Sequence, residues 1–296
     1  MLLLITGSSD GTSNMLCTRL GDDVFRLNYD LFFDYNISLN VDSWEIESPS
    51  GRVIASENAH AVFWWKAFNF YPTQKDGLLV GEMKYICREL YNWGRLNHKL
   101  RGNPPDFHNH LGKINILGIA AKFFLVPKTT VVSGNGRLVP KFSGPVVAKS
   151  LSSGTTDSKK VLFTTEVKVD QLDLSYPWYL QTKVQSKFDV TVFVCGRRQF
   201  AFSRSRENLS GLDWRAEQSF DVNSAEWGRY TLSDRHEKKI ADFCSALGVD
   251  WGRLDFMEAE NDLVFLEYNA NGQFLFLDYF NRHRIHDAVA QYLAKV

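Results

Sequence analysis

The sequence has no excess of charge of either sign. Its 296 residues include 34 Lys plus Arg and 34 Asp plus Glu, so the formal net charge at pH 7 is zero. Without a net positive charge or a basic stripe, no long-range field draws the chain to nucleic acid or to an anionic membrane. We therefore expect neither partner, and any polyanion that the protein binds must be held by a local site.

Cysteines are few and long apolar runs are missing. Cys17, Cys87, Cys195 and Cys244 lie far apart with no paired spacing, which argues against a zinc knuckle or a redox pair. The apolar opening at residues 1–6 is short and lacks a basic flank and a cleavage site. No window reaches the roughly 20 apolar residues of a membrane span. We expect buried free thiols and a cytoplasmic protein.

The chain has ample material for a core, because 44% of its residues are hydrophobic and 14% are aromatic. This length and composition predict two or three lobes. A strand, a Gly/Ser turn, a helix and a second strand over residues 2–30 indicate an open α/β sheet, and the chain as a whole reads as α/β (α+β). Further helices are expected at 75–100, 111–124, 233–248 and 284–296, with a helix-like 168–174, short β segments over 145–184, and longer strands from 188.

Two segments carry partial signals for phosphate binding. Residues 7–13, GSSDGTS, follow a strand and open a helix, where backbone N–H groups can hold an anion. They lack the lysine of a P-loop and the Rossmann glycine spacing, so a tight turn or a substrate-contact loop is the favoured interpretation. Lys149 lies within an apolar strand and needs an anionic partner, and the Gly-rich loop after it suits a phosphate flap or a solvated hairpin.

A second group of polar residues lies at the end of a predicted β-hairpin. Glu267 and Asn269 are two residues apart, so a strand would place both side chains on one face. Asp255 precedes them on the neighbouring strand and would lie opposite. Two carboxylates and an amide are hard oxygen ligands of the kind that Mg²⁺ prefers. We favour a metal site over an Asn-Ala-Asn-Gly turn capped by its own side chains.

The order of these features resembles that of an ATP-grasp ligase over nearly the whole chain. The features are Lys113 on a helix, Pro127-Lys128-Thr129, Lys149 with its Gly-rich flap, the YLQTKV linker, Asp255 and EYNANGQ. The segments ITGSSDGTS, FWWKAF, GNPP, DWR and NANGQFLFLD are more narrowly similar to those of graspetide synthetases. That family installs ester or amide cross-links between side chains of ribosomal peptides such as the microviridins.

The resemblance implies three lobes. These are an N-terminal pre-ATP-grasp domain with a linker helix at 1–110, a small central α+β lobe at 111–185, and a mostly antiparallel C-terminal lobe at 186–296. ATP would be held between the last two. Relatives of this kind are commonly dimers, so a homodimer is an expectation, although the sequence shows no interface signature.

The resemblance also implies the roles of individual residues. Lys113 and Lys149 would contact the phosphates of ATP, and Asp189 would lie near the ribose or the phosphates. The Mg²⁺ ions would be held by Asp255, Glu267 and Asn269. The adenine would be held at the hinge made by Gln181, Thr182, Lys183 and Val184.

The sequence departs from the family's pattern at one position. The family usually has arginine two residues after the aspartate that matches Asp189, whereas this chain has Thr191. That arginine would help to hold the γ-phosphate and the acyl phosphate. Either Arg204, Arg206 or Arg215 supplies the missing guanidinium, or transfer is impaired.

The implied reaction is the ATP-dependent, ADP-forming ligation of a carboxylate to a hydroxyl or an amine through an acyl phosphate. The expected partner is a precursor peptide with acidic core residues, bound by the three arginines above and by Lys66, Asp10 and Gln273, the last in a substrate or structural role. Two rivals stay open. One is a ligase that adds an amino acid to a peptide or protein terminus, and the other is a non-catalytic binding partner of another ligase.

Overall fold

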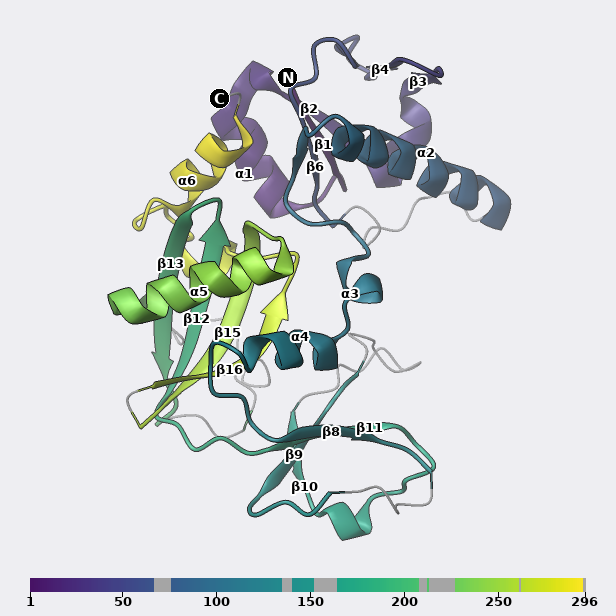
Figure 1. The fold of residues 1–296 in the computed structure, drawn as a ribbon. Helices are drawn as coiled ribbons and strands as arrows, with labels where there is room; N and C mark the ends of the chain where they lie inside the picture. The colour runs from purple at the N-terminus through teal and green to yellow at the C-terminus, as the bar shows by residue number, and fades with distance from the viewer. Residues whose placement is uncertain are drawn as a thin grey trace.

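The computed structural model describes residues 1–66, 76–134, 140–151, 164–207, 212, 227–260 and 262–294. The described chain forms three regions in succession, each built on its own sheet (Figure 1). The N-terminal sheet lies at the top of Figure 1, the C-terminal sheet in the middle and the central sheet at the bottom. Along the chain the order is N-terminal, central and C-terminal, and the lobe boundaries at 110 and 185 stay predictions.

The N-terminal region is a parallel sheet in the order β2-β1-β6-β7, flanked by a small antiparallel sheet β3-β4-β5. All five residues of β1 are buried, as an apolar run in a parallel sheet predicts. Asp76 caps α2 by accepting hydrogen bonds from the first-turn amides of Leu78 and Leu79. The elements are β1 (Leu2–Thr6), α1 (Gly11–Leu20), β2 (Val24–Asn28), β3 (Asn36–Leu39), β4 (Trp44–Glu47), β5 (Val53–Ala55), β6 (Ala61–Trp64), α2 (Gly77–Leu96) and β7 (Leu100–Arg101), with 3₁₀ turns η1 (Gly21–Asp23) and η2 (Tyr29–Asp34).

The central region is an antiparallel sheet in the order β10-β9-β11-β8, preceded by two short helices. The helix expected at 111–124 is shorter, and the helix-like 168–174 is only the 3₁₀ turn η4 (Val169–Gln171), since a short polar segment cannot sustain a helix without packing. The elements are α3 (Phe107–His110), α4 (Lys113–Ala120), β8 (Thr129–Val132), β9 (Val146–Lys149), β10 (Thr165–Val167) and β11 (Trp178–Thr182).

The C-terminal region is an antiparallel sheet in the order β14-β13-β12-β15-β16. One face of this sheet carries the core side chains that pack against α4 and α5, and the opposite face holds most of the polar residues considered below. The elements are β12 (Phe188–Cys195), β13 (Arg198–Ser205), β14 (Gly228–Arg229), α5 (Asp234–Leu247), β15 (Trp251–Ala259), β16 (Asp262–Asn269), the 3₁₀ turn η6 (Leu275–Leu277) and α6 (Ile285–Leu293).

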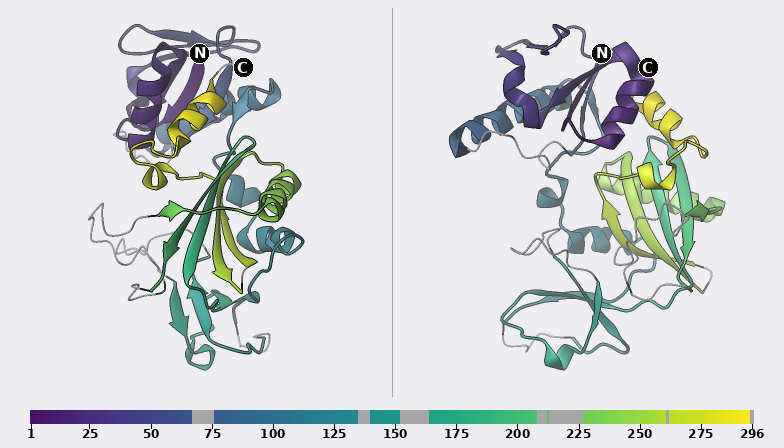
Figure 2. Two further views of the ribbon diagram at one scale, coloured as in Figure 1. Left: turned by 90° about the vertical axis from the view of Figure 1, so that its left-hand side faces the viewer. Right: turned by 180° about the vertical axis from the view of Figure 1, so that it is seen from behind.

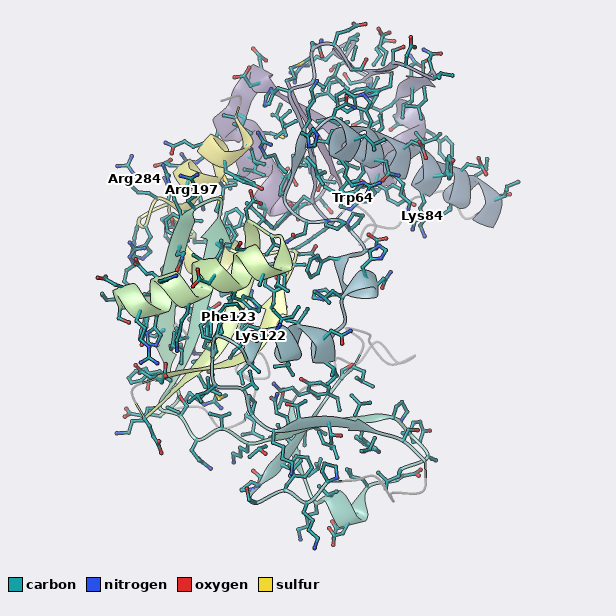
Figure 3. The ribbon with its side chains drawn as sticks, viewed as in Figure 1. Trp64, Lys84, Lys122, Phe123, Arg197 and Arg284 are labelled. Carbon is teal, nitrogen blue, oxygen red and sulfur yellow. The ribbon has the colours of Figure 1, made fainter. Side chains whose placement is uncertain are left out.

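Aromatic contacts join the three regions. Trp251, at the start of β15, packs its ring against Phe63 and Trp65 of the N-terminal region, with ring centroids 5.1 Å and 6.0 Å apart. Phe123, labelled in Figure 3, packs against Phe243 of α5, which anchors the segment after α4 on the C-terminal sheet. The last helix returns to the N-terminal region, where α6 lies beside α1 (Figure 2). These contacts fix the N-terminal sheet at the end of the C-terminal sheet where β15 begins.

Two expectations drawn from scarcity are confirmed for the described residues. All four cysteines are free, and three of them are buried. None of the helices in the described ranges combines the length and the apolarity that crossing a bilayer requires.

A glycine on β15, Gly252, allows the ring of Tyr268 on β16 to pack close to the backbone. Gly252 has φ +146°, and a Cβ at this position would lie 2.4 Å from the ring of Tyr268. We expect Gly252→Ala to lower the free energy of unfolding by about 1–3 kcal/mol, because the ring cannot retreat from the packed core. Gly118→Ala in α4 is the control, since its Cβ would meet nothing within 4 Å. Thermal and urea unfolding would measure both variants, and equal stabilities would contradict the expectation.

Candidate active site

The residues of the predicted metal site lie on two neighbouring strands, β15 and β16, next to Thr191 on β12. Thr191 of β12 pairs with Asp255 of β15, and Asp255 pairs with Glu267 of β16. Residues directly opposite each other in antiparallel strands point to the same face. Two positions further along the register, on the same face, Arg253 pairs with Asn269. The expectation that Glu267 and Asn269 share a face with Asp255 opposite is therefore confirmed.

A β-bulge at the same place sets the direction of Glu267. The register runs from Asp255 paired with Glu267 directly to Phe256 paired with Phe265, so Leu266 is the extra residue. An extra residue shifts the alternation of the strand and bends it locally. Leu266 and Glu267 are consequently both half-buried, and Leu266 lines the adjoining cavity. The bulge thus brings an apolar and an acidic side chain to one face.

Among the described residues, three side chains are seen to donate hydrogen bonds to Asp255. Thr191 Oγ1 donates to Oδ1 at 2.7 Å, and Asn269 Nδ2 donates to Oδ2 at 2.7 Å. Arg253 donates from Nε to Oδ1 and from Nη2 to Oδ2, each at 3.0 Å. The Asn269 amide nitrogen also lies 3.4 Å from Glu267 Oε1. Donors therefore surround this carboxylate, and the amide nitrogen lies between the two acidic groups.

The residues present fit a magnesium ion bound jointly with phosphates. Mg²⁺ in proteins is usually held by one or two carboxylates, with water and substrate phosphates completing its octahedral coordination. Asp255 and Glu267 supply two carboxylates, and Asn269 supplies an amide whose oxygen can replace its nitrogen by rotation. In the described parts of the chain, no three His, Cys, Asp or Glu side chains converge to hold a metal by themselves. A cation here would need phosphate ligands.

A cavity of about 470 Å³ lies between the central sheet and the C-terminal sheet. A volume of this size suits a small ligand such as a nucleotide. Residues from both sheets line it, including Val147 of β9 and Met257 of β15. Five residues with predicted roles in binding ATP are in its wall, and they are Lys149, Gln181, Thr182, Lys183 and Val184.

The two lysines predicted to meet the phosphates lie close together. Lys113 is the first residue of α4, and its Nζ donates to the backbone carbonyl of Ser150 at 2.8 Å. Lys149 precedes that residue at the end of β9 and lines the cavity. Burial and the charge of Lys113 lower the pKa of His108, and Glu267 is near enough to act against that shift. Lys113, His108 and the acidic end of the site therefore share one neighbourhood.

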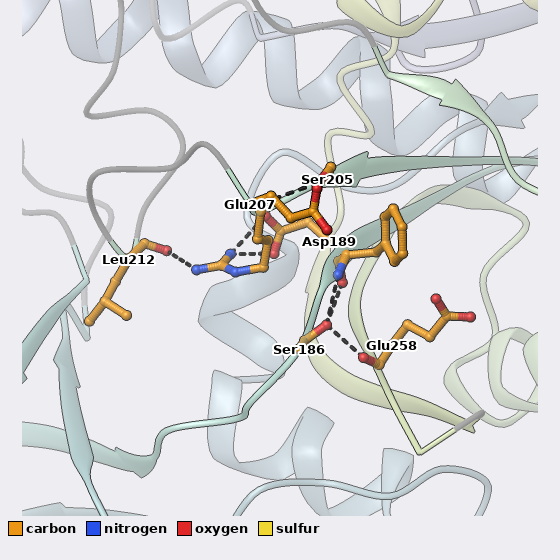
Figure 4. A network of polar contacts seen from close by, with 8 residues as sticks. Ser186, Asp189, Ser205, Glu207, Leu212 and Glu258 are labelled. Atoms are coloured by element: carbon orange, nitrogen blue, oxygen red, sulfur yellow. Dashed lines mark hydrogen bonds and ion pairs between the residues drawn. The ribbon is translucent and has the colours of Figure 1, made fainter.

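Asp189 forms a buried ion pair beside the cavity. Arg206 Nη1 lies 2.7 Å from both of its carboxylate oxygens, and Arg206 Nη2 donates to the carbonyl of Leu212 (Figure 4). Burial raises the pKa of Asp189, although Arg206 acts to lower it. Arg206 lines the cavity, whereas Asp189 does not. Arg204 is paired with Asp189 in the register of β12 and β13.

Three of the residues predicted to meet a substrate, Asp10, Lys66 and Gln273, lie at the other end of the acidic residues, toward the N-terminal sheet. Asp10 caps α1 by accepting from Ser13, and it also accepts from Trp65 Nε1 at 3.0 Å. Lys66 has φ +53° and its ammonium lies 4.9 Å from the Trp65 ring centroid. Gln273 is exposed, and its carbonyl accepts from Arg253 Nη1. Their predicted roles in binding a substrate stay predictions.

Arg253 is the residue that the sequence reading missed. Arg206 binds Asp189 and Arg204 is paired with it in the register, and Asp189 lies two register positions away from the pair of Thr191 and Asp255. The predicted Arg215 and the Gly-rich flap at 152–160 lie outside the described residues. Because Arg253 is two residues before Asp255 on a strand, the two-residue period already placed both side chains on one face. The signal was present in the sequence.

Three comparisons relate the chain to known proteins. No protein-family model matches the sequence, and no curated protein matches it either. Among solved structures, a RiPP-associated ATP-grasp ligase of Chryseobacterium gregarium, in complex with ADP and a leader and core peptide, superposes with a TM-score of 0.80 at 24% identity. That match covers 99% of this chain and 96% of the other.

Two further structures extend the likeness. The macrocyclase MdnC of Microcystis aeruginosa MRC, bound with the precursor peptide MdnA, matches with a TM-score of 0.78 at 21% identity, covering 99% of this chain and 98% of that one. The D-alanine–D-alanine ligase of Bacillus anthracis, complexed with ATP, matches with a TM-score of 0.53 at 11% identity, covering 99% and 94%. The chain therefore has the ATP-grasp fold, as expected from the sequence.

Proposed function

We propose that this protein is an ATP-dependent, ADP-forming ligase that joins an Asp or Glu side chain of a precursor peptide to a hydroxyl or amine of the same peptide. The observation that carries the proposal is the cavity lined by Lys149, which lies beside the paired carboxylates of Asp255 and Glu267. Of the three structures of the same fold named above, the Chryseobacterium gregarium ligase was solved with ADP and a peptide, MdnC with a precursor peptide, and the D-alanine–D-alanine ligase with ATP.

The residues around the cavity suit the activation of a carboxylate by ATP. A carboxylate oxygen of the peptide would attack the γ-phosphorus, and the bond from that phosphorus to the ADP oxygen would break. A hydroxyl or amine would then attack the carbonyl carbon of the acyl phosphate, lose its proton and displace phosphate. Lys149 and Lys113 would stabilise the negative charge on the phosphates, since such transfer depends on positioning and charge neutralisation.

Asp255, Glu267 and Asn269 would hold Mg²⁺ at the end of the cavity. The ion would neutralise charge on the transferring phosphoryl group and orient it. The wall of the cavity made by Gln181 to Val184 would receive the adenine, next to the apolar side chains of Met257 and Leu266. Asp189 would act there through Arg206, because only the arginine of this pair lines the cavity.

The direct test is co-expression with an acidic peptide that contains Ser, Thr or Lys and is encoded beside the gene. We expect the peptide to lose the mass of one water molecule for each cross-link formed, because condensation joins two of its own side chains. The same peptide expressed alone is the control. Mass spectrometry would measure the product, and fragmentation would locate the cross-linked residues.

Two outcomes would favour the rival functions. A gain of one amino acid residue in mass would indicate a ligase that extends a peptide or protein terminus. An unchanged peptide, without ADP release by the purified protein, would indicate a non-catalytic partner of another ligase. Both results would overturn the proposed cyclisation.

A further inference from the structure

A second cavity lies between α1 and the segment that leads into α6. It has a volume of about 470 Å³, and it shares no lining residue with the cavity of the candidate active site. The two helices are far apart in the sequence but lie beside each other in the structure (Figure 2). The wall includes Met15 and Arg19 of α1, and Tyr279, Phe280, Asn281 and His286 of the later segment.

The wall of this cavity contains a buried polar atom without a partner. The side chain of His286 is only 4% exposed, and its Nε2 makes no hydrogen bond within the described parts of the chain. Burial lowers the pKa of His286, so the imidazole is neutral at pH 7 and Nε2 can accept or donate according to its tautomer. An unpaired buried polar atom is costly, so a ligand that brings a hydroxyl or an amide to it regains free energy.

Two neighbouring aromatic rings are exposed beside the cavity. Tyr279 is 61% exposed and Phe280 is 69% exposed, although their ring centroids lie only 5.9 Å apart. The Cζ of Arg282 lies 5.3 Å from the ring centroid of Phe280. A single exposed apolar side chain needs no explanation, but two adjacent rings beside a cavity form a patch that suits the apolar side chain of a partner.

Arginines outnumber acidic residues around the cavity. Asp287 binds two of them, since Arg19 Nη1 donates to its Oδ1 and Arg284 Nε donates to its Oδ2 at 3.2 Å. The side chain of Arg284 is 81% exposed and is labelled in Figure 3. Arg282 adds a third guanidinium, and the other acid of this loop, Asp278, is only 3% exposed. This face is therefore positively charged and favours an anionic partner.

Helix α1 joins this cavity to the end of the candidate active site where a substrate is expected. Asp10 caps the first turn of α1 and accepts a hydrogen bond from Trp65, whereas Arg19 lies in the last turn. A helix rises 1.5 Å per residue, so these two positions are about 14 Å apart along the axis. Four or five extended peptide residues cover this distance. A peptide that reacts at the active site can therefore reach the second cavity.

We propose that the cavity between α1 and α6 binds a segment of the precursor peptide that lies outside the residues to be joined. An apolar or aromatic side chain of this segment would pack on Tyr279 and Phe280, and its acidic side chains would pair with Arg282 and Arg284. This inference rests on the proposed ligase function and adds a second contact for its substrate. The expected acidic character of the peptide complements the positive face, and such complementarity gives specificity and faster association.

Photo-crosslinking in the full chain tests the inference directly. The photoreactive residue p-benzoylphenylalanine would replace Phe280 in one variant and Tyr85 in the control, because Tyr85 is a 61% exposed aromatic residue of α2. The probe is the acidic peptide encoded beside the gene, added without ATP. We expect a covalent adduct with the peptide from position 280 and none from position 85. Mass spectrometry of the adduct should locate it outside the residues that the enzyme joins.

Kinetics with the same peptide give a second measurement. Phe280→Ala and Arg282→Glu should each raise the KM for the peptide by about 5- to 10-fold, as the loss of one interface contact does. The kcat and the KM for ATP should stay within about twofold, because neither residue lines the active-site cavity. Tyr85→Ala and Arg235→Glu are the matched controls, since Arg235 of α5 is 72% exposed, and both should keep the wild-type values.

Three outcomes would decide against the inference. An adduct yield at position 280 no higher than at position 85, or an unchanged peptide KM in Phe280→Ala and Arg282→Glu, would overturn it. Adducts between two copies of the protein would assign this face to an interface between copies instead. Because the adduct forms without ATP, a peptide that is captured but never condensed would contradict the ligase proposal and leave this peptide site in place.

Discussion

Asp255→Asn should lower kcat for the peptide reaction by about 100- to 1,000-fold, or ~3–4 kcal/mol of transition-state stabilisation. Asp255 lies opposite Glu267 and accepts hydrogen bonds from Thr191, Arg253 and Asn269. Asparagine has the same size but no negative charge, so the attraction for a divalent cation falls. Release of ADP in the presence of peptide, measured over a series of Mg²⁺ concentrations, would show the loss and a higher Mg²⁺ requirement.

Glu260→Gln provides the control for this variant. Glu260 is an exposed carboxylate at the turn of the same β15-β16 hairpin, so its replacement removes one negative charge from the hairpin at the end away from the site. Turnover by this variant should match the wild type. Equal losses in the two variants, or an Asp255→Asn protein with full activity, would exclude Asp255 as a ligand of the ion.

Arg206→Met should lower the free energy of unfolding by about 3–5 kcal/mol, because it leaves the charge of Asp189 buried without its partner. The side chains of Arg206 and Asp189 are 13% and 10% exposed, so water screens the pair only weakly. Urea unfolding, followed by fluorescence, would measure the difference. A loss below 1 kcal/mol would show that the ion pair is not the main support of Asp189.

The deficit of Arg206→Met should depend on pH in a defined direction. Burial raises the pKa of Asp189, and without Arg206 the main opposing charge is lost. Between the unfolded and the raised folded pKa of such an acid, the folded state binds more protons than the unfolded state, so stability falls as the pH rises through this window and stays low above it. The deficit should therefore be smaller at pH 5 than at pH 8. Adding Asp189→Asn should restore part of the stability, because no charge is then left unpaired.

The threonine at 191 has a defined place in the site. Its hydroxyl donates to Asp255 Oδ1, and its side chain is almost fully buried. The guanidinium that binds Asp255 comes instead from Arg253 of the neighbouring strand. Arg206 binds Asp189, and Arg204 is opposite Asp189 in the register, while Arg215 lies outside the described residues. Position 191 thus has threonine where the family usually has arginine, and an arginine from another position, Arg253, binds the carboxylate of Asp255.

The sequence by itself determined the elements and much of the site. Glu267 and Asn269 share a face because side chains on a strand alternate with a period of two, and this rule needs only local order. The apolar run of β1 is likewise buried, and Met83 and Leu90, two helical turns apart in α2, are both buried as one face of the helix. Such features depend on neighbouring residues, so they can be predicted before the fold is known.

Only the tertiary structure decided which strands meet and in what register. The hairpin was predicted, but the bulge that makes Leu266 the extra residue and sets the exact register of Asp255 against Glu267 depends on pairing that no local pattern specifies. The packing of Trp65 against Trp251 joins residues that are 186 positions apart in the sequence. The burial of the site residues and the charges around them come from distant parts of the chain, which are brought together only when the three regions pack.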